Sequence, residues 1–278
     1  MKRVLTVAML VLAVVGVAFA AGGKEGASGV NFIMNNGAEP QTLDPSKISG
    51  TPEHKIYMAL FEGLVINDPK TSLAMPGIAE SWKVSADGKT ITFKLRKSTW
   101  SDGVAITAQT VVDSWLRNLD PATGAEYAYM VNMAVKGAEA FNAGKAGKET
   151  VAIKAVDDYT FQVELIGPMP YAVDMMSHYA FAILPMHVIN KFGDEWVKVG
   201  NIVGNGPFKL AEWKPNESLT VVANDKYWDA KTVKLSSVTF LPIEDNLTAY
   251  NKFKAGEIDW AHGVPLDLID EIKLRPDY

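Results

Sequence analysis

The segment 76–117 constrains the fold most strongly, because two strand patterns and a helix pattern follow one another directly within it. Apolar residues alternate through residues 81–85 and 90–95, which is the periodicity of a half-buried strand. The Asp87-Gly88 pair between these runs favours a tight hairpin turn, because glycine adopts positive φ without steric strain. The segment therefore predicts a hairpin, and the chain must combine sheet with helix.

An amphipathic helix is expected soon after this hairpin. A second Asp-Gly turn, Asp102-Gly103, comes before Thr107, whose hydroxyl can cap a helix N-terminus. The residues that follow are apolar at helical spacing, namely Ala108, Val111, Val112, Trp115, Leu116 and Leu119. One face of this helix should therefore be buried.

Further strand and helix patterns run along the rest of the chain. Strands are expected at residues 30–35, 151–156, 160–165, 208–213, 218–223 and 238–243. Helices are expected at residues 51–63 and 247–254 and in a short segment that ends at Phe192, with Thr51 as the cap of the first. Residues 120–133 and 141–150 are expected to be loops.

The composition supports a folded protein and excludes several functions. Apolar residues make up 48% of the 278 residues, which is enough for one large domain or two modest ones. The formal net charge of −5 offers no electrostatic attraction to nucleic acid, so no nucleic-acid partner is expected. Cysteine is absent, which excludes disulfides, thiol nucleophiles and thiolate metal sites.

Residues 1–20 have the pattern of a cleavable secretory signal peptide. Lys2 and Arg3 form a charged start, an apolar run follows to Phe19, and Ala20 ends a small-residue cleavage site. A membrane anchor is the alternative, but the apolar run is slightly short for a bilayer. Because no Cys near this segment could carry a lipid, the mature protein is expected to be free in the periplasm.

The sequence contains no constellation of residues typical of an enzyme. The four histidines do not occur at metal-ligand spacing, and neither HExxH nor GxSxG is present. Gly88-Lys89-Thr90 resembles the end of a phosphate-binding loop, but Lys83 occupies the position where that loop needs a glycine. We therefore expect no catalysis, no metal and no cofactor.

Motifs along most of the chain are similar to those of the extracytoplasmic solute-binding proteins that serve peptide ABC transporters. The matching motifs are EPQTLDP at 39–45, LFEGL at 60–64, AESW at 79–82, DGKT at 87–90, WSDG at 100–103, GNGPF at 204–208, NDKYW at 224–228 and AGEID at 255–259. The resemblance extends from about residue 31 to the end of the chain.

The resemblance implies an α/β fold of the periplasmic-binding-protein type, in the type II class that includes the large peptide binders. Residues 21–60 and 185–278 would form a discontinuous lobe around a mixed sheet, and residues 61–184 would form an inserted α+β subdomain. Because members of this family are about twice as long, we expect the chain to be an N-terminal half in which the second lobe is absent.

The function implied by the resemblance is that of a receptor. It would capture oligopeptides and deliver them to an ABC transporter permease, as a monomer and without catalysis. In such receptors two lobes close on an extended peptide, whose main chain is held by hydrogen bonds. The same scaffold could instead bind a dipeptide, a nickel chelate or an oligosaccharide. A secreted hydrolase is a more distant alternative.

The resemblance also implies a set of ligand-binding residues. They are Ser49, Gly50, Thr51, Tyr127, His178, Asn205, Gly206, His262 and Gly263. Ser49 stands where well-known oligopeptide binders hold an acidic residue, so a preference for basic ligand side chains is not implied. Packing is the alternative role for Tyr127 and His178, and turn geometry is the alternative for Asn205 and Gly206. The family's acidic anchor for the peptide amino terminus belongs to the second lobe.

Overall fold

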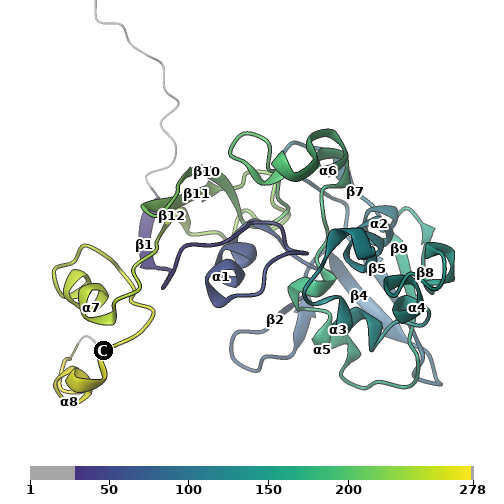
Figure 1. Ribbon diagram of the computed structural model, residues 1–278, viewed down its shortest axis with the longest axis horizontal. Helices are drawn as coiled ribbons and strands as arrows, with labels where there is room; N and C mark the ends of the chain where they lie inside the picture. The colour runs from purple at the N-terminus through teal and green to yellow at the C-terminus, as the bar shows by residue number, and fades with distance from the viewer. Residues whose placement is uncertain (1–28, 277–278) are drawn as a thin grey trace, which may run out of the picture.

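The computed structural model describes residues 29–276, so the predicted signal peptide lies outside the described residues. Two four-stranded sheets lie side by side along the long axis of the molecule (Figure 1). Helix α1 (Thr51–Leu60) lies between them. The fold is therefore α/β, with α1 at the centre of the molecule.

The first sheet joins strands from distant parts of the chain. Its strands, in spatial order, are β1 (Val30–Asn35), β12 (Leu235–Leu241), β11 (Ser218–Ala223) and β10 (Phe208–Lys214). β1 runs parallel to β12, whereas the other neighbours are antiparallel, so the sheet is mixed. Helix α7 (Asn246–Lys254) follows β12 in the chain.

The register of the first sheet aligns its apolar residues on one face. Leu219 lies opposite Phe240, and Val221 lies opposite Val238. All four side chains are buried. Because successive residues of a strand point to opposite faces, this register places the apolar set together in the core.

The second sheet is built entirely from antiparallel neighbours. Its strands, in spatial order, are β4 (Ala79–Val84), β5 (Thr90–Leu95), β9 (Thr160–Glu164) and β8 (Ile153–Asp157). Helix α2 (Ala108–Leu119) packs across β8 and β9. The strands of the first sheet lie within the predicted lobe, residues 21–60 and 185–278, and those of the second sheet lie within the predicted subdomain, residues 61–184. The boundaries of these two parts stay predictions.

Trp115 anchors α2 to the second sheet. Its ring packs edge-on against Phe161 and Phe181, at centroid distances of 5.0 and 5.1 Å. Its indole Nε1 donates to the Phe181 carbonyl at 3.0 Å, so the polar end of this buried ring has a partner. Thr107 caps the helix by accepting a hydrogen bond from the Thr110 backbone N–H, as predicted.

Short elements complete the fold. Two small sheets pair β2 (Val65–Asn67) with β3 (Ala74–Pro76) and β6 (Ser98–Thr99) with β7 (Ala105–Ile106). The short helices are α3 (Ala128–Asn132), α4 (Ala138–Asn142), α5 (Ala172–Met175), α6 (Met186–Phe192) and α8 (Ile269–Ile272). Single 3-10 segments are found at Pro121–Thr123, Lys148–Thr150, Tyr179–Phe181, Gly193–Val197 and Leu266–Leu268.

Helix α1 differs from its prediction at both ends. Thr51 is the first helical residue and does not cap the helix; the N-cap is Gly50, which has no side chain to donate or accept a bond. The Glu53 carboxylate lies against Gly50, and a negative charge in the first turn interacts favourably with the helix dipole. The helix ends at Leu60, because Phe61 has an extended backbone.

The two predicted loops contain helical turns, which is a second correction. Residues 120–133 include α3 and a 3-10 segment, and residues 141–150 begin in α4 and end in another. Helices this short are unstable alone and depend on packing. Val131 of α3 and Ala138 of α4 are buried, and both helices contact α2. Long-range packing therefore creates helices that the local pattern does not indicate.

Candidate ligand-binding site

Helix α1 has one buried face and one outer face that carries polar groups. Thr51 and Met58 are exposed on the outer face, and His54 and Lys55 on the same face are half-buried. Residues three and four apart share a helix face, so these four side chains form one stripe. The residues buried on the opposite side are Glu53, Ile56, Tyr57, Ala59 and Leu60.

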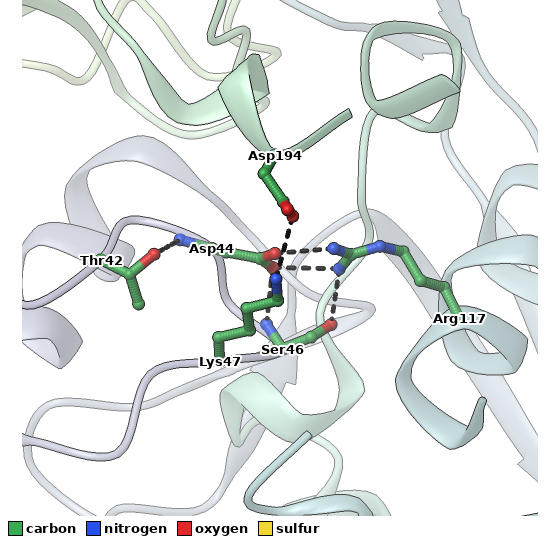
Figure 2. Close-up of polar contacts among 6 residues, drawn as sticks. All are labelled: Thr42, Asp44, Ser46, Lys47, Arg117 and Asp194. Carbon is green, nitrogen blue, oxygen red and sulfur yellow. Dashed lines mark hydrogen bonds and ion pairs between the residues drawn. The ribbon is translucent and has the colours of Figure 1, made fainter. Parts of the chain in front are cut away.

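The loop that leads into α1 is held by a buried ion pair (Figure 2). Arg117 of α2 binds the Asp44 carboxylate through two hydrogen bonds of 3.0 and 2.6 Å, and it also donates to Ser46 Oγ at 3.0 Å. The Asp44 and Arg117 side chains are only 4% and 13% exposed. Residues 49–51, the first of the predicted ligand-binding segments, follow directly and are thereby positioned relative to the second sheet.

Tyr127 and His178 come together at one end of α1. Their ring centroids are 5.0 Å apart, and both rings contact Tyr179, at 5.2 and 3.9 Å. The Tyr179 ring lies 5.6 Å from His54 of α1. The structure therefore connects two of the predicted site residues to the outer face of the helix, although no ligand contact is tested by this geometry.

His178 is a neutral imidazole at pH 7. Its Nδ1 accepts a hydrogen bond from the Ala180 backbone N–H at 3.1 Å. Burial, with a smaller contribution from the nearby His54, lowers the pKa of His178 to about 4. Because Nδ1 is an acceptor and the ring is neutral, the proton lies on Nε2, which can donate to a peptide carbonyl.

His54 is the polar group of α1 that lacks a partner. Burial lowers its pKa, and its Nδ1 atom is buried without a hydrogen bond to any residue within 29–276. A buried acceptor without a partner is unfavourable unless a ligand or water satisfies it. His54 Nδ1 is therefore an unsatisfied polar atom buried beneath the helix face that carries Thr51 and Lys55.

Lys55 connects α1 to His262, the predicted site residue furthest along the chain. The Lys55 ammonium donates to the Asn36 carbonyl at 2.8 Å and lies 3.1 Å from His262 Nδ1. It also lies over the Trp260 ring, 5.2 Å from its centroid. Gly263 is packed next to this group, and a Cβ atom there would be 2.8 Å from Asn246 Oδ1.

We give the name α1 row to the residues that carry these contacts on the outer face of α1. It consists of Tyr127, His178, Tyr179, His54, Lys55, His262 and Trp260. Its two ends come from residues far apart in the sequence, and α1 links them. The α1 row thus contains three of the predicted site residues and lies beside the start of α1, where residues 49–51 are found.

Asn205 and Gly206 instead hold the C-terminal end of α1. Asn205 is 1% exposed, and its side chain accepts from the Glu62 N–H at 2.9 Å and donates to the Glu62 carbonyl at 2.8 Å. The Gly206 N–H donates to the Leu60 carbonyl, and a Cβ atom at Gly206 would lie 2.7 Å from the Phe61 nitrogen. Both residues thus have clear packing roles, and their contact with a ligand stays a prediction.

Glu62 is a buried carboxylate just beyond α1. It accepts hydrogen bonds from the Tyr227 hydroxyl and, at 2.7 Å, from the Trp228 Nε1. Arg96 stacks on the Trp228 ring at 3.5 Å. Burial outweighs these favourable contacts and raises the pKa of Glu62 to about 7. Glu62 and His54 both line a cavity of about 230 Å³ beside α1.

Four residues of the α1 row were not predicted from the sequence. They are His54, Lys55, Tyr179 and Trp260. A sequence pattern marks His54 and Lys55, because they follow Thr51 at helical spacing on the polar face of the predicted helix. No local signal marks Tyr179 or Trp260, although each is close in sequence to a predicted site residue.

Metal and membrane sites were sought in the described part of the chain. Among residues 29–276, no three His, Asp or Glu side chains are grouped so that they could hold a metal ion. No helix within the same residues is long and apolar enough to cross a bilayer.

The two sheets with α1 between them match the α/β fold expected of a periplasmic-type solute-binding protein. The sequence profile described as bacterial extracellular solute-binding proteins, family 5, middle part, matches residues 74–278. The chain belongs to this family. The predicted family is thereby confirmed.

Named relatives match most of this chain. The periplasmic oligopeptide-binding protein OppA of Salmonella typhimurium is 41% identical over 246 residues, which are 87% of this chain and 45% of OppA. The periplasmic murein peptide-binding protein MppA of Escherichia coli is 40% identical over 84% of this chain and 43% of MppA. The chain spans about half the length of the curated relatives it matches.

Solved structures confirm the predicted fold class. An oligopeptide-binding protein of Borrelia burgdorferi superposes with a TM-score of 0.86 and 40% identity, over 89% of this chain and 50% of that protein. Haemophilus influenzae OppA in complex with the peptide RPPGFSPFR gives a TM-score of 0.85 and 40% identity, over 88% of this chain and 48% of OppA.

Proposed function

We propose that this chain provides the N-terminal part of a receptor that captures oligopeptides and delivers them to an ABC transporter permease. The receptor acts in the periplasm as a monomer and without catalysis. The observation that carries this proposal is the α1 row, in which ring contacts run from Tyr127 to His54, and Lys55 on the same helix face contacts His262. The names of OppA and MppA, which both bind peptides, support it.

The α1 row suits a peptide main chain. The His178 Nε2–H can donate to a carbonyl, and the half-buried ring of Tyr127, which packs on the buried Tyr179, offers contact area to varied side chains. Main-chain hydrogen bonds give affinity without selecting one side chain, which is what a receptor for many peptides requires. The site lies on α1 and on segments packed against it, and this rigid placement lowers the entropy lost on binding.

Another solute is the alternative within the same family. The probable deoxycholate-binding periplasmic protein YgiS of Escherichia coli is 39% identical over 82% of this chain, and its name gives a ligand that is not a peptide. The scaffold therefore does not fix the ligand by itself. A dipeptide, a nickel chelate and an oligosaccharide remain the other candidates.

Native mass spectrometry of the protein purified gently from its host tests the proposal. A spread of adducts with the masses of different peptides is the expected result. One repeated mass of a sugar, a bile acid or a metal would keep the fold and overturn the peptide ligand. Hydrolysis of a peptide or ester by the purified protein would overturn the receptor function.

A double variant tests the assignment of the site. Tyr127→Ala with His178→Ala should weaken peptide binding by about tenfold or more, because one ring contact and one hydrogen bond are lost. Tyr171→Ala with His187→Ala is the matched control, since the same two residue types are removed outside the α1 row. Equal affinities of the two double variants would reject Tyr127 and His178 as ligand contacts.

A further inference from the structure

Lys55 carries a positive charge that has no carboxylate partner in the described part of the chain. Within residues 29–276, no Asp or Glu oxygen lies within 4.0 Å of its ammonium. Its neighbours are the Asn36 carbonyl, the His262 ring and the Trp260 face, which are all uncharged. A half-buried ammonium without a counter-ion favours binding of an anion, because part of its hydration has already been lost.

One ammonium hydrogen of Lys55 has no hydrogen-bond partner between residues 29 and 276. The group has three donors and no acceptor. One donor is used by Asn36 at 2.8 Å and a second by His262 Nδ1 at 3.1 Å. The third has no hydrogen-bond acceptor among the described residues, and the ammonium lies 5.2 Å from the Trp260 ring centroid, a contact that still permits an anion to approach.

The contact with Lys55 fixes the protonation of His262. Because the ammonium can only donate, His262 Nδ1 must accept, and the ring proton must lie on Nε2. Burial and the charge of Lys55 both lower the pKa of His262, so the ring stays neutral at pH 7 with Nε2–H as a donor. The imidazole thus accepts from the ammonium through Nδ1 and directs its own donor away from Lys55.

The surroundings provide room for a ligand group. His262 and Trp260 line a cavity of about 510 Å³ together with Phe253, Asp259, Ala261, Gly263 and Val264. Asp259 is the acidic residue in this lining, and its carboxylate accepts a hydrogen bond from the Ile33 backbone N–H at 2.8 Å. It therefore contributes to the edge of the first sheet and forms no ion pair with Lys55.

The charged and titratable groups near Lys55 also favour an anion at this position. Glu53 of α1 is buried, and its carboxylate accepts from the Gln41 N–H at 2.8 Å. Ser49, at the start of the site, is uncharged, and His54 on the same helix face has its pKa lowered by burial. Among the residues that the structure describes, the outer face of α1 thus carries the Lys55 charge without an acidic ion-pair partner.

We propose that Lys55 and His262, with the Trp260 ring beside them, form a subsite for a carboxylate of the bound peptide. This inference rests on the proposed function and specifies its ligand class, namely peptides that place an acidic group at this end of the α1 row. The carboxylate binds the free ammonium hydrogen of Lys55, and the contact with His262 Nδ1 holds the ammonium in place. It belongs either to an Asp or Glu side chain or to the peptide C-terminus.

Competition binding with the full protein tests this subsite. The probes are alanine tetrapeptides with Glu or Gln at each position in turn, prepared with a free or an amidated C-terminus. Each probe displaces a fluorescent peptide from the wild type and from Lys55→Met, which keeps the aliphatic stem and removes the charge. Lys83→Met is the matched control, because Lys83 is exposed on β4 in the other sheet.

A preference of about 10- to 100-fold for the acidic probe is expected in the wild type, as for a charge-assisted hydrogen bond. Lys55→Met should abolish the preference, and Lys83→Met should retain it. A preference for Glu over Gln identifies a side-chain carboxylate, whereas a preference for the free over the amidated terminus identifies the C-terminal carboxylate. Either result supports the subsite.

Two results overturn the inference and are distinguishable. Peptides that bind without any preference, or a preference that persists in Lys55→Met, would refute the carboxylate subsite and leave peptide binding intact. If no probe displaces the fluorescent peptide, and the protein copurifies with a ligand that is not a peptide, the proposed function fails and the subsite with it. Circular dichroism melting of each variant shows whether an altered affinity follows from unfolding.

Discussion

Glu62 should make the stability of this protein depend on pH in a direction that is unusual for a carboxylate. In the folded state its pKa is raised from 4.5 to about 7, chiefly because the carboxylate is buried. The unfolded state therefore releases the Glu62 proton at a lower pH than the folded state does. Stability is fully present below pH 4.5 and is lost as the pH rises through 7.

The size of this effect follows from the difference between the two pKa values. Each unit corresponds to about 1.4 kcal/mol, so the free energy of unfolding should fall by about 3 kcal/mol between pH 4.5 and 7 on account of Glu62 alone. Glu62→Gln removes the ionisation and retains the shape. The amide oxygen can accept from Trp228 Nε1, and the amide nitrogen can donate to the Tyr227 hydroxyl oxygen.

The comparison between wild type and Glu62→Gln isolates Glu62 from the other titrating groups. His178 and His54 have lowered pKa values, so each contributes stability that rises as the pH increases towards the unfolded pKa of 6.5 and is fully present above it. This opposite contribution is common to both proteins and cancels in their difference. Unfolding in urea, followed by tryptophan fluorescence between pH 4.5 and 7.5, gives both free energies.

The expected result is a divergence of the two stability profiles. At pH 4.5 the two proteins should be of similar stability, and near pH 7 the variant should be more stable by about 3 kcal/mol. A difference that stays constant within about 0.5 kcal/mol over this range would refute the reasoning. Glu62 would then be ionised in the folded protein, with Tyr227, Trp228 and Arg96 compensating for its burial.

Two further predictions concern contacts that position α1. Asp44→Ala should destabilise the protein by about 3–5 kcal/mol in urea unfolding, because Arg117 is left buried without its partner. Lys47→Ala breaks an ion pair that is largely exposed and should cost less than about 1 kcal/mol; equal losses for the two variants would contradict the importance of burial. Asn205→Ala should lower the free energy of unfolding by about 2–4 kcal/mol, because the buried N–H and C=O of Glu62 both lose their partners. Thermal unfolding measures the effect. A shift in the thermal midpoint as small as that of an exposed Asn→Ala change would contradict the prediction.

The parts of the fold that depend on local sequence could be predicted well. The strands β4 and β5 follow from alternating apolar residues around an Asp-Gly turn, and Gly88 has the positive φ that this turn requires. Helix α2 and its Thr107 cap follow from the spacing of its buried residues. In these segments the local pattern and the tertiary packing favour the same structure.

The parts that depend on distant contacts could not be predicted from local patterns. Thr is a common N-cap residue, but Thr51 is the first helical residue of α1 and does not cap it. In the first turn, the Glu53 carboxylate accepts a hydrogen bond from the distant Gln41 backbone N–H. The resemblance to a family placed Tyr127 and His178 at the site, but their contact with each other needs the fold. The pairing of Lys55 with His262 spans almost the whole described chain, and no pattern within a short window can indicate it.

The parallel pairing of β1 with β12 sets the order in which this protein can be completed during synthesis. Phe32 pairs with Val238, so the first strand to leave the ribosome has no native neighbour until nearly all of the described chain has followed. The second sheet needs only residues 79–164. A strand without a neighbour exposes N–H and C=O groups that can pair with other chains. The connectivity of the first sheet therefore makes the nascent chain, rather than the finished protein, the form most exposed to aggregation.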